Sequence, residues 1–184
     1  MSININDTPS FLPVQSAKDR TIFQKGLYRA FIANPFSKWV QANYGKDDKS
    51  QRMWPKSNSF DVESFLLADR KGSPISGFSF NYNCGETALT QFEQIGFKKP
   101  SGGEFCEVLH YFNFSESGRN GIKSGNSLRE IVICAAGERG INRAYATCPN
   151  PRVKKLYEMF GWRTESYIKF NNGTESWLIC YTAE

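Results

Sequence analysis

The chain contains 184 residues, 40% of them hydrophobic, which is a usual length for one domain and long enough to bury a sizeable core. The net charge of +5 is mild and the Lys and Arg residues are spread along the chain, so no nucleic-acid partner is indicated. No apolar run reaches the length of a membrane span, and the N-terminus lacks the basic and apolar regions of a secretory signal, so we expect a cytoplasmic protein with no membrane partner.

The cysteines argue against a metal centre and against a disulfide framework. They are odd in number, lie far apart and form no Cys-x-x-Cys pair, and His110 is the only histidine of the chain. We therefore predict reduced, buried thiols and no metal site. The five cysteines are Cys84, Cys106, Cys134, Cys148 and Cys180.

The N-terminal section, residues 1–58, is predicted to be mainly helical. Ser16 and Asp19 have the spacing of a helix cap, and the apolar residues that follow predict a helix over residues 16–32. Asn34-Pro35 interrupts it, and a short aromatic helix is expected over residues 36–44. The polar residues 45–58 are expected to form a loop.

The middle of the chain has the alternation of β-strands. Residues 61–68 and 75–82 predict a hairpin around a polar turn that contains Gly72 and Pro74. Residues 83–103 read as a connection with one short helix over residues 88–95, and residues 105–114 form a strongly apolar strand.

The last third alternates between strands and helices. A loop rich in Gly, Ser and Asn over residues 115–126 precedes a helix over residues 127–138, and a strand over residues 141–148 follows. A helix over residues 151–160 begins with a proline, which the first helical position favours.

A final hairpin closes the chain. Residues 165–170 and 175–181 pair around Asn171-Asn172-Gly173, a turn sequence that favours tight hairpins. The whole order of elements predicts one mixed α/β domain over residues 1–184.

Two features of the second half can carry chemistry. The loop over residues 115–126 would place backbone N–H groups at a helix N-terminus, where a pyrophosphate binds well, and Arg119 and Lys123 could add charged contacts. A plain connection is the alternative. Tyr157, near the start of the helix after a buried strand, could protonate a thiolate leaving group in a cleft between splayed strands, or it could simply pack.

The strand over residues 105–114 carries two further candidates. In a regular strand Glu107 and His110 lie on opposite faces, so only one of them can face a given cleft unless a bulge intervenes. Each has a purely structural alternative, as a bonded buried carboxylate or a satisfied core histidine. Cys148 could suggest a covalent acyl-cysteine, but no activating base is evident beside it in the sequence.

Residues 150–162 resemble the Asn-x(5)-Leu-Tyr-Glu-x-x-Gly-Phe segment of the GNAT superfamily of acyl-CoA N-acyltransferases, with Trp162 in the aromatic place. Residues 114–128 are similar to that family's strand end, Arg/Gln-x-x-Gly-x-Gly/Ala loop and helix start. With Arg119 as the first motif residue, Ile122 stands where the first glycine belongs and Gly125 comes one residue late. The likeness covers residues 63–181.

The resemblance implies an α/β (mixed α+β) fold with a mostly antiparallel, twisted central sheet. Two central strands would splay in a V, and about four helices would flank the sheet. It also implies direct transfer of an acetyl group from acetyl-CoA, or of another acyl group from its CoA thioester, to a small-molecule or protein amine. The protein would be a monomer or a homodimer.

The resemblance also assigns roles to single residues. Tyr157 would be the general acid, and Glu107 stands where several family members place a general base, with His110 as a second candidate. Asn150 would lie beside the cofactor together with Tyr157. The backbone at the end of the central strand would pair with the pantetheine arm, and the following loop would hold the pyrophosphate. These cofactor residues are Asn113, Phe114, Ser115, Arg119, Gly121, Lys123, Ser124, Gly125, Asn126 and Ser127.

Two other functions remain open at this point. Residues 92–114 look like the central part of acyl-homoserine-lactone synthases, which share the fold, use S-adenosylmethionine and carry Glu-x-x-Arg where this chain has Glu107-Val-Leu-His110. The Phe60-Asp61 pair partly resembles the conserved Phe-Asp pair of those enzymes. A GNAT-like binding module without turnover is the other alternative. The acceptor-side wall is expected from aromatic residues of the N-terminal section, namely Phe31, Phe36, Trp39, Tyr44 and Trp54.

Overall fold

The computed structural model describes most of the sheet and two helices. It describes residues 10–32, 44–56, 62–82, 98, 105–114, 129, 132–133, 138–169, 173 and 175–182. The predicted helix over residues 88–95, most of the predicted helix over residues 36–44 and the whole loop over residues 115–126 lie outside these ranges. No helix within them is long and apolar enough to cross a bilayer.

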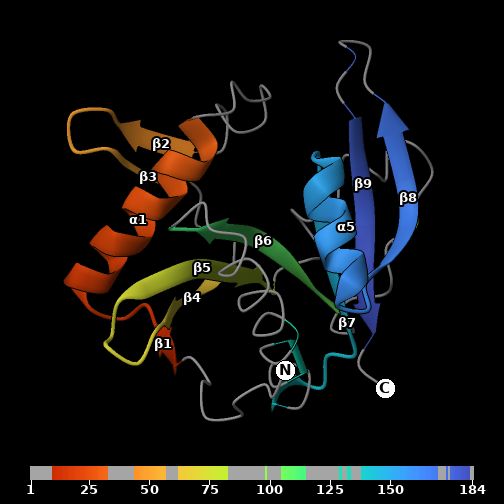
Figure 1. Cartoon of the computed structure of the whole chain (residues 1–184), viewed down its shortest axis with the longest axis horizontal. Helices are drawn as coiled ribbons and strands as arrows, with labels where there is room; N and C mark the ends of the chain where they lie inside the picture. The colour runs from red at the N-terminus through yellow and green to blue at the C-terminus, as the bar shows by residue number, and fades with distance from the viewer. Residues whose placement is uncertain are drawn as a thin grey trace, which may run out of the picture.

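Seven strands form one sheet in the order β1-β4-β5-β6-β7-β9-β8, and all neighbours are antiparallel except β6 and β7 (Figure 1). The predicted mixed α/β architecture and mostly antiparallel sheet are confirmed. Two helices are described, where about four were expected. The strands of the sheet are β1 Ser10–Pro13, β4 Val62–Ala68, β5 Pro74–Asn81, β6 Phe105–Asn113, β7 Arg143–Cys148, β8 Arg163–Lys169 and β9 Glu175–Thr182.

Helix α1, Ala17–Ile32, begins where the sequence predicts. The Ser16 hydroxyl accepts a hydrogen bond from the Asp19 N–H at 3.0 Å and donates to its carboxylate at 2.5 Å. This cap satisfies an N–H group that the first turn leaves without a partner. Phe23 and Leu27 form the buried side of the helix.

The expected loop over residues 45–58 is instead largely a hairpin, and the same correction applies to Tyr44, which belongs to a strand and not to the predicted helix. Strands β2, Tyr44–Asp47, and β3, Arg52–Pro55, form a separate two-stranded sheet beside α1. Only Tyr44 and Met53 are buried in it, so its sequence is mostly polar and gives little apolar alternation. Strand β1 was also missed, because its four residues depend on pairing with β4.

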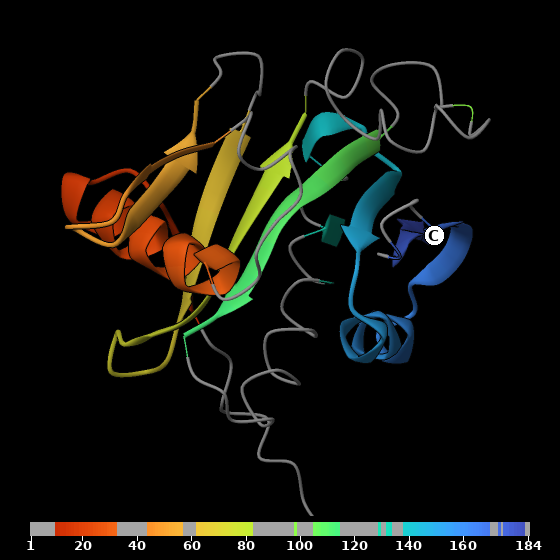
Figure 2. The same cartoon turned by 90° about the horizontal axis from the view of Figure 1, so that it is seen from above.

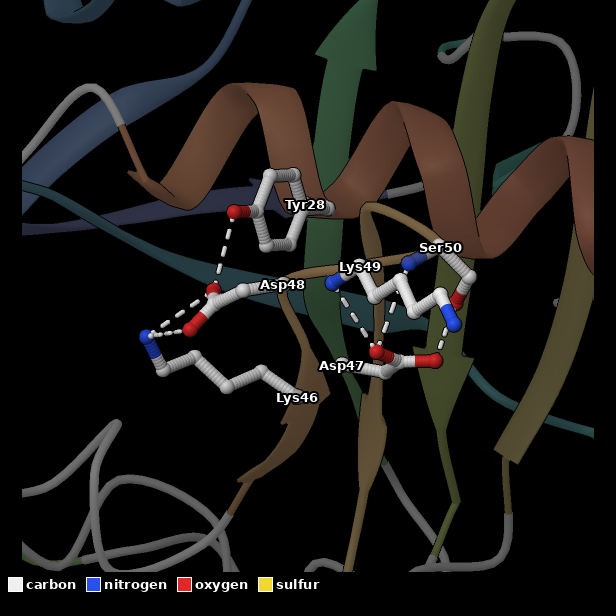
Figure 3. A network of polar contacts seen from close by, with 6 residues as sticks. All are labelled: Tyr28, Lys46, Asp47, Asp48, Lys49 and Ser50. Carbon is white, nitrogen blue, oxygen red and sulfur yellow. Dashed lines mark hydrogen bonds and ion pairs between the residues drawn. The ribbon is translucent and has the colours of Figure 1, made fainter.

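The turn of this hairpin is built from side-chain to backbone bonds and is tied to α1 (Figure 3). The Asp47 carboxylate accepts from the N–H of Ser50 at 3.3 Å and from its hydroxyl at 2.5 Å. The Tyr28 hydroxyl of α1 donates to Asp48 at 2.9 Å, and Lys46 bonds the same carboxylate. These contacts fix the hairpin at a defined distance from the helix.

The sheet opens between its two central strands. In β6, Phe105–Val108 pair in parallel with residues 143–146 of β7. The later residues of β6 pair with β5 but not with β7. Figure 2 shows the two strands side by side at their beginnings and apart at their ends. The V-shaped splay predicted from the resemblance is therefore present.

Helices α1 and α5, Pro151–Met159, cover opposite faces of the sheet. Phe23 of α1 packs against Phe112, whereas Tyr157 of α5 packs against Tyr111, the preceding residue of β6. Neighbouring residues of a strand point to opposite faces, so the two helices lie on different sides. Each side has its own group of buried apolar residues.

Two glycines let α1 approach the sheet closely. A Cβ atom at Gly26 of α1 or at Gly77 of β5 would overlap the ring of Phe112, which is 4% exposed. The ring is therefore held between helix and sheet at a spacing that only glycine permits. This contact sets the position of the α1 side of the site.

Candidate functional site

A bulge in β6 brings the two polar candidates of this strand to the same face. Ser79 of β5 pairs with His110, but the next residue, Phe80, pairs with Val108, so Leu109 is an extra residue in β6. The extra residue reverses the alternation after it. Glu107 and His110 therefore both face α1, opposite residues that stand two apart on β5.

His110 is bonded through both ring nitrogens. The Tyr44 hydroxyl lies 2.5 Å from Nε2, and the Ser79 hydroxyl contacts Nδ1. In a neutral imidazole one nitrogen donates and the other accepts, so both hydroxyls are satisfied in either tautomer. The side chain is 2% exposed, and this burial lowers the pKa of His110 to about 3, so the ring is uncharged at neutral pH.

Glu107 lies in the same buried polar group. It is 7% exposed and faces Asn81, which is fully buried on β5. Burial, and then the charge of Glu107, raise the pKa of Tyr44 far above its ordinary value. The carboxylate is thus close enough to act on the hydroxyl that bonds His110.

Tyr157 lies on the other face, over the opening between the strands. Its ring packs edge-on against Tyr111 of β6 with centroids 5.8 Å apart, and against Trp162 at 4.9 Å. Burial first, and then Tyr111 and the Cys148 thiol at the end of β7, raise the pKa of Tyr157 well above its ordinary value. The phenol thus packs against β6, is close enough to the Cys148 thiol of β7 to be influenced by its charge, and stays protonated at neutral pH.

Asn150 and Cys148 hold the start of α5. The Asn150 Oδ1 atom accepts from the Arg152 N–H at 2.9 Å and caps the helix, with Pro151 at a helix-starting position as the sequence predicts. The Cys148 thiol donates to the Asn150 carbonyl at 3.1 Å, and burial raises its pKa. A protonated, buried thiol is a poor nucleophile, which argues against an acyl-cysteine.

At the end of β6, Asn113 and Phe114 differ in what their backbones can bind. The Phe114 N–H donates to the Ile75 carbonyl at 2.8 Å, so this group already has a partner in the sheet. Successive residues of a strand direct their backbone groups to opposite sides, so the backbone of Asn113 faces the splay. The other predicted cofactor residues lie outside the described part of the chain: Ser115, Arg119, Gly121, Lys123, Ser124, Gly125, Asn126 and Ser127.

Two of the aromatic residues expected on the acceptor side, Phe31 and Tyr44, lie around His110. Phe31 stacks on Tyr44 with centroids 5.9 Å apart and meets the His110 ring edge-on at 6.0 Å. Phe23 of α1, which the sequence does not single out, also meets that ring edge-on at 6.2 Å. Phe36 and Trp39 lie outside the described residues. Within the described part of the chain, no group of three His, Cys, Asp or Glu side chains gathers as it would around a metal ion.

A cavity of about 260 Å³ opens beside this cluster. It lies between α1, the end of β3 and the start of β4, and His110 is among its lining residues. His110 is therefore reachable from the α1 side of the sheet.

Among comparisons with known proteins, the one with solved structures supports the fold. No family model matches the sequence, and no curated protein matches it. Among solved structures, Arabidopsis thaliana NAA60 in complex with acetyl-CoA is 14% identical, with 95% of this chain and 98% of that chain covered and a TM-score of 0.59. The GNAT domain of S. lividans PAT is 14% identical over 95% and 90% of the two chains, with a TM-score of 0.55.

TofI, an acyl-homoserine-lactone synthase, was solved in a ternary complex with an inhibitor and MTA. It is 12% identical over 95% of this chain and 91% of that chain, with a TM-score of 0.68. At such identities the likeness concerns architecture. The chain therefore has the fold that GNAT acetyltransferases share with acyl-homoserine-lactone synthases.

Proposed function

We propose that this protein is an acyl-CoA-dependent N-acyltransferase, with acetyl-CoA as the donor and an amine as the acceptor. The observation that carries the proposal is the position of Tyr157, which contacts Tyr111 of β6 and is close to Cys148 of β7 where these strands separate. A thioester lying in this opening would have a protonated phenol on one face. Glu107 and His110 would lie on the other.

Tyr157 is the general acid in this scheme. When the amine attacks the thioester carbonyl, the leaving thiolate needs a proton, and a buried phenol with a raised pKa holds one across the neutral range. Its site between apolar rings also excludes water from the leaving group.

Glu107 is the general base, directly or through one water, and His110 is a positioning residue. Both nitrogens of His110 already have partners, and burial lowers its pKa to about 3, so it is a weak proton acceptor at neutral pH. It instead holds Tyr44 in place beside the Glu107 carboxylate. The ammonium group of the acceptor first loses a proton to that carboxylate, and the neutral amine then attacks the thioester carbonyl.

Asn113 is the described residue best placed to pair with the pantetheine arm, because its backbone faces the splay. The Phe114 N–H is already bonded to Ile75, so no contact with the cofactor is assigned to it. Loop residues 123–127 remain the proposed pyrophosphate site on the strength of the sequence resemblance alone. Asn150 helps by fixing the start of the helix that carries Tyr157.

Signal synthesis from S-adenosylmethionine is less well supported. The corresponding synthases carry an arginine where this chain has His110, and a neutral imidazole with a pKa lowered to about 3 does not supply the missing positive charge. Incubation with acyl-CoA and S-adenosylmethionine, with and without a second amine, separates the two reactions by mass spectrometry of the products. A lactone product would overturn amine acylation.

Titration calorimetry with acetyl-CoA tests the proposal first. Binding with one site per chain is expected, and native mass spectrometry of the purified protein should detect retained coenzyme A. Amine-dependent release of CoA should then be measurable with a thiol reagent. Absence of acetyl-CoA binding at millimolar concentration would overturn the proposal, and binding without release from a broad amine panel would leave a binding module.

A further inference from the structure

The cavity beside His110 has an apolar interior and an open, charged rim. Arg20, Phe23, Gln24 and Leu27 line one wall, and their spacing along α1 places all four on the same side of that helix. Met53 is among the residues that face them from β3.

Exposure varies with depth in this cavity. Phe23, Leu27 and Met53 are 6%, 0% and 5% exposed and form the interior, whereas Trp54 is 37% exposed at the rim. His110, at 2%, forms the floor. A ligand that enters therefore passes a polar edge, is then surrounded by apolar side chains, and ends beside the buried polar group.

The rim carries a single sign of charge. Among the described residues that line the cavity, Arg20 holds the only formal charge, because burial lowers the pKa of His110 to about 3. The Arg20 side chain is exposed, and none of the described residues accepts a hydrogen bond from its guanidinium. Guanidinium groups pair well with carboxylates, often through two parallel hydrogen bonds.

We infer that this cavity is the acceptor site and that the acceptor is a small amine with an apolar, ring-sized body and a carboxylate at the end remote from the amine. The carboxylate pairs with Arg20, the apolar body lies between Phe23 and Met53, and the amine points to the floor. The volume of about 260 Å³ is slightly below the range of roughly 300–1,000 Å³ for drug-sized ligands, so it suits a small molecule. This inference rests on the proposed acyl transfer.

The floor is correctly placed for that reaction. Glu107 and His110 face residues that stand two apart on β5, which corresponds to roughly 7 Å along the strand. An amine at the floor therefore lies within about one strand repeat of the proposed base. The cavity and the splay are then two entrances to one reaction centre, for the amine and the thioester respectively.

Two probes with the same ring test the charge requirement: benzylamine and 4-(aminomethyl)benzoate. Calorimetry or ligand-observed NMR without CoA should show that the carboxylate probe binds the wild-type chain about tenfold more tightly. Arg20→Gln should remove this difference and leave benzylamine unchanged, while Arg20→Lys should restore part of it. Arg29→Gln, an exposed site on the same helix that does not line the cavity, is the matched control.

The outcomes separate this inference from the proposed function. Arg20-dependent binding of the carboxylate probe with no acetyl transfer to any amine would support the cavity assignment and overturn the acyltransferase proposal. Equal binding of both probes, or an equal loss in Arg20→Gln and Arg29→Gln, would overturn the cavity assignment. So would acetylation of a protein amine that neither probe inhibits, although acyl transfer itself would then stand.

Discussion

His110 illustrates how one buried residue can link pH to both stability and geometry. It is the only histidine of the chain, and it is uncharged in the folded protein because burial lowers its pKa to about 3. In the unfolded chain its pKa is near 6.5. Below that pH, His110 binds a proton in the unfolded state but not in the folded state, so the free energy of unfolding must decrease as the pH falls.

The first prediction follows from this linkage. Between pH 6.5 and pH 4.5, His110 should reduce the free energy of unfolding by roughly 1.4 kcal/mol for each pH unit. Urea unfolding of the wild type and of His110→Gln at several pH values measures the effect. The variant should be less stable at pH 7. It should also lose less stability on acidification, because it lacks the histidine that takes up a proton on unfolding, while its carboxylates titrate as in the wild type. Parallel pH profiles would show that His110 is not the group responsible.

A second prediction concerns the proposed acid. Tyr157→Phe should lower kcat by roughly 10²- to 10⁴-fold, the usual contribution of a positioned proton donor, with little change in acetyl-CoA affinity. The raised pKa of Tyr157 also means that the wild-type rate should not fall through loss of this proton up to about pH 10. Tyr111→Phe, which changes the neighbouring ring, is the control. Comparable kcat values for wild type and Tyr157→Phe would remove Tyr157 from the mechanism.

The sequence singles out Tyr157 and Glu107, whose catalytic roles stay predictions, but it could not predict the surroundings that the structure shows. Tyr157 follows a strand and a helix cap, and these signals are local. The partners of His110 are not local, since Tyr44 and Ser79 are 66 and 31 residues away in the chain. The bulge at Leu109 is defined by the register of β6 with β5. The sequence of β6 alone therefore shows only that Glu107 and His110 would share a face if a bulge were present.

At the scale of elements, the packing of α1 on the sheet controls the site. The helix supplies Phe23 to the surroundings of His110 and one wall of the cavity. Its distance from the sheet is set by the Phe112 ring between Gly26 and Gly77. The β2–β3 hairpin adds the facing wall and is held to α1 by the bond from Tyr28 to Asp48.

Gly26→Ala tests this packing. In a helix interior the change normally stabilises by about 1 kcal/mol, but here the new methyl group would overlap the buried Phe112 ring. Overpacking of this kind costs about 1–3 kcal/mol, so a net loss is expected in chemical unfolding. Phe112→Leu in the Gly26→Ala background should recover part of that loss. If the two substitutions change the free energy of unfolding additively, the contact between residue 26 and the Phe112 ring does not set the helix–sheet spacing.

Elements with strong apolar periodicity were predictable, and those stabilised by neighbours were not. Helix α1, the β4–β5 and β8–β9 hairpins, β6 and α5 all appear where the pattern predicts them. The β2–β3 hairpin was predicted as a loop because only Tyr44 and Met53 are buried, and α1 provides the cover for both. Strand β1 is too short to show a pattern without its partner β4.

At the scale of the whole molecule, the sheet consists of two halves that meet over four residue pairs of β6 and β7. A cofactor bound in the splay would contact both halves. A ligand that binds the folded state but not the unfolded state stabilises the protein by mass action. The stabilisation is about 2.7 kcal/mol when the ligand concentration is one hundred times the Kd. The proposed cofactor should therefore raise the melting temperature of the protein.

Acetyl-CoA at one hundred times its Kd should raise Tm by roughly 5–11 °C, from about 2–4 °C per kcal/mol for a chain of this length. Differential scanning fluorimetry measures the shift. It should weaken with added salt, because the cofactor is anionic and the chain carries a net charge of +5. Tyr157→Phe should keep the full shift. A shift in the wild type that Tyr157→Phe abolishes would mean that this residue binds the cofactor and does not only donate a proton.

The extra residue in β6 also affects how relatives of this protein should be recognised. With the bulge, the carboxylate and the imidazole share a face at the spacing Glu-x-x-His. A relative with a regular strand would need Glu-x-His for the same arrangement, because side chains then alternate strictly. Alignments that forbid a one-residue gap at Leu109 would pair the histidine of one protein with a core residue of the other. A search for this pair should therefore accept both spacings.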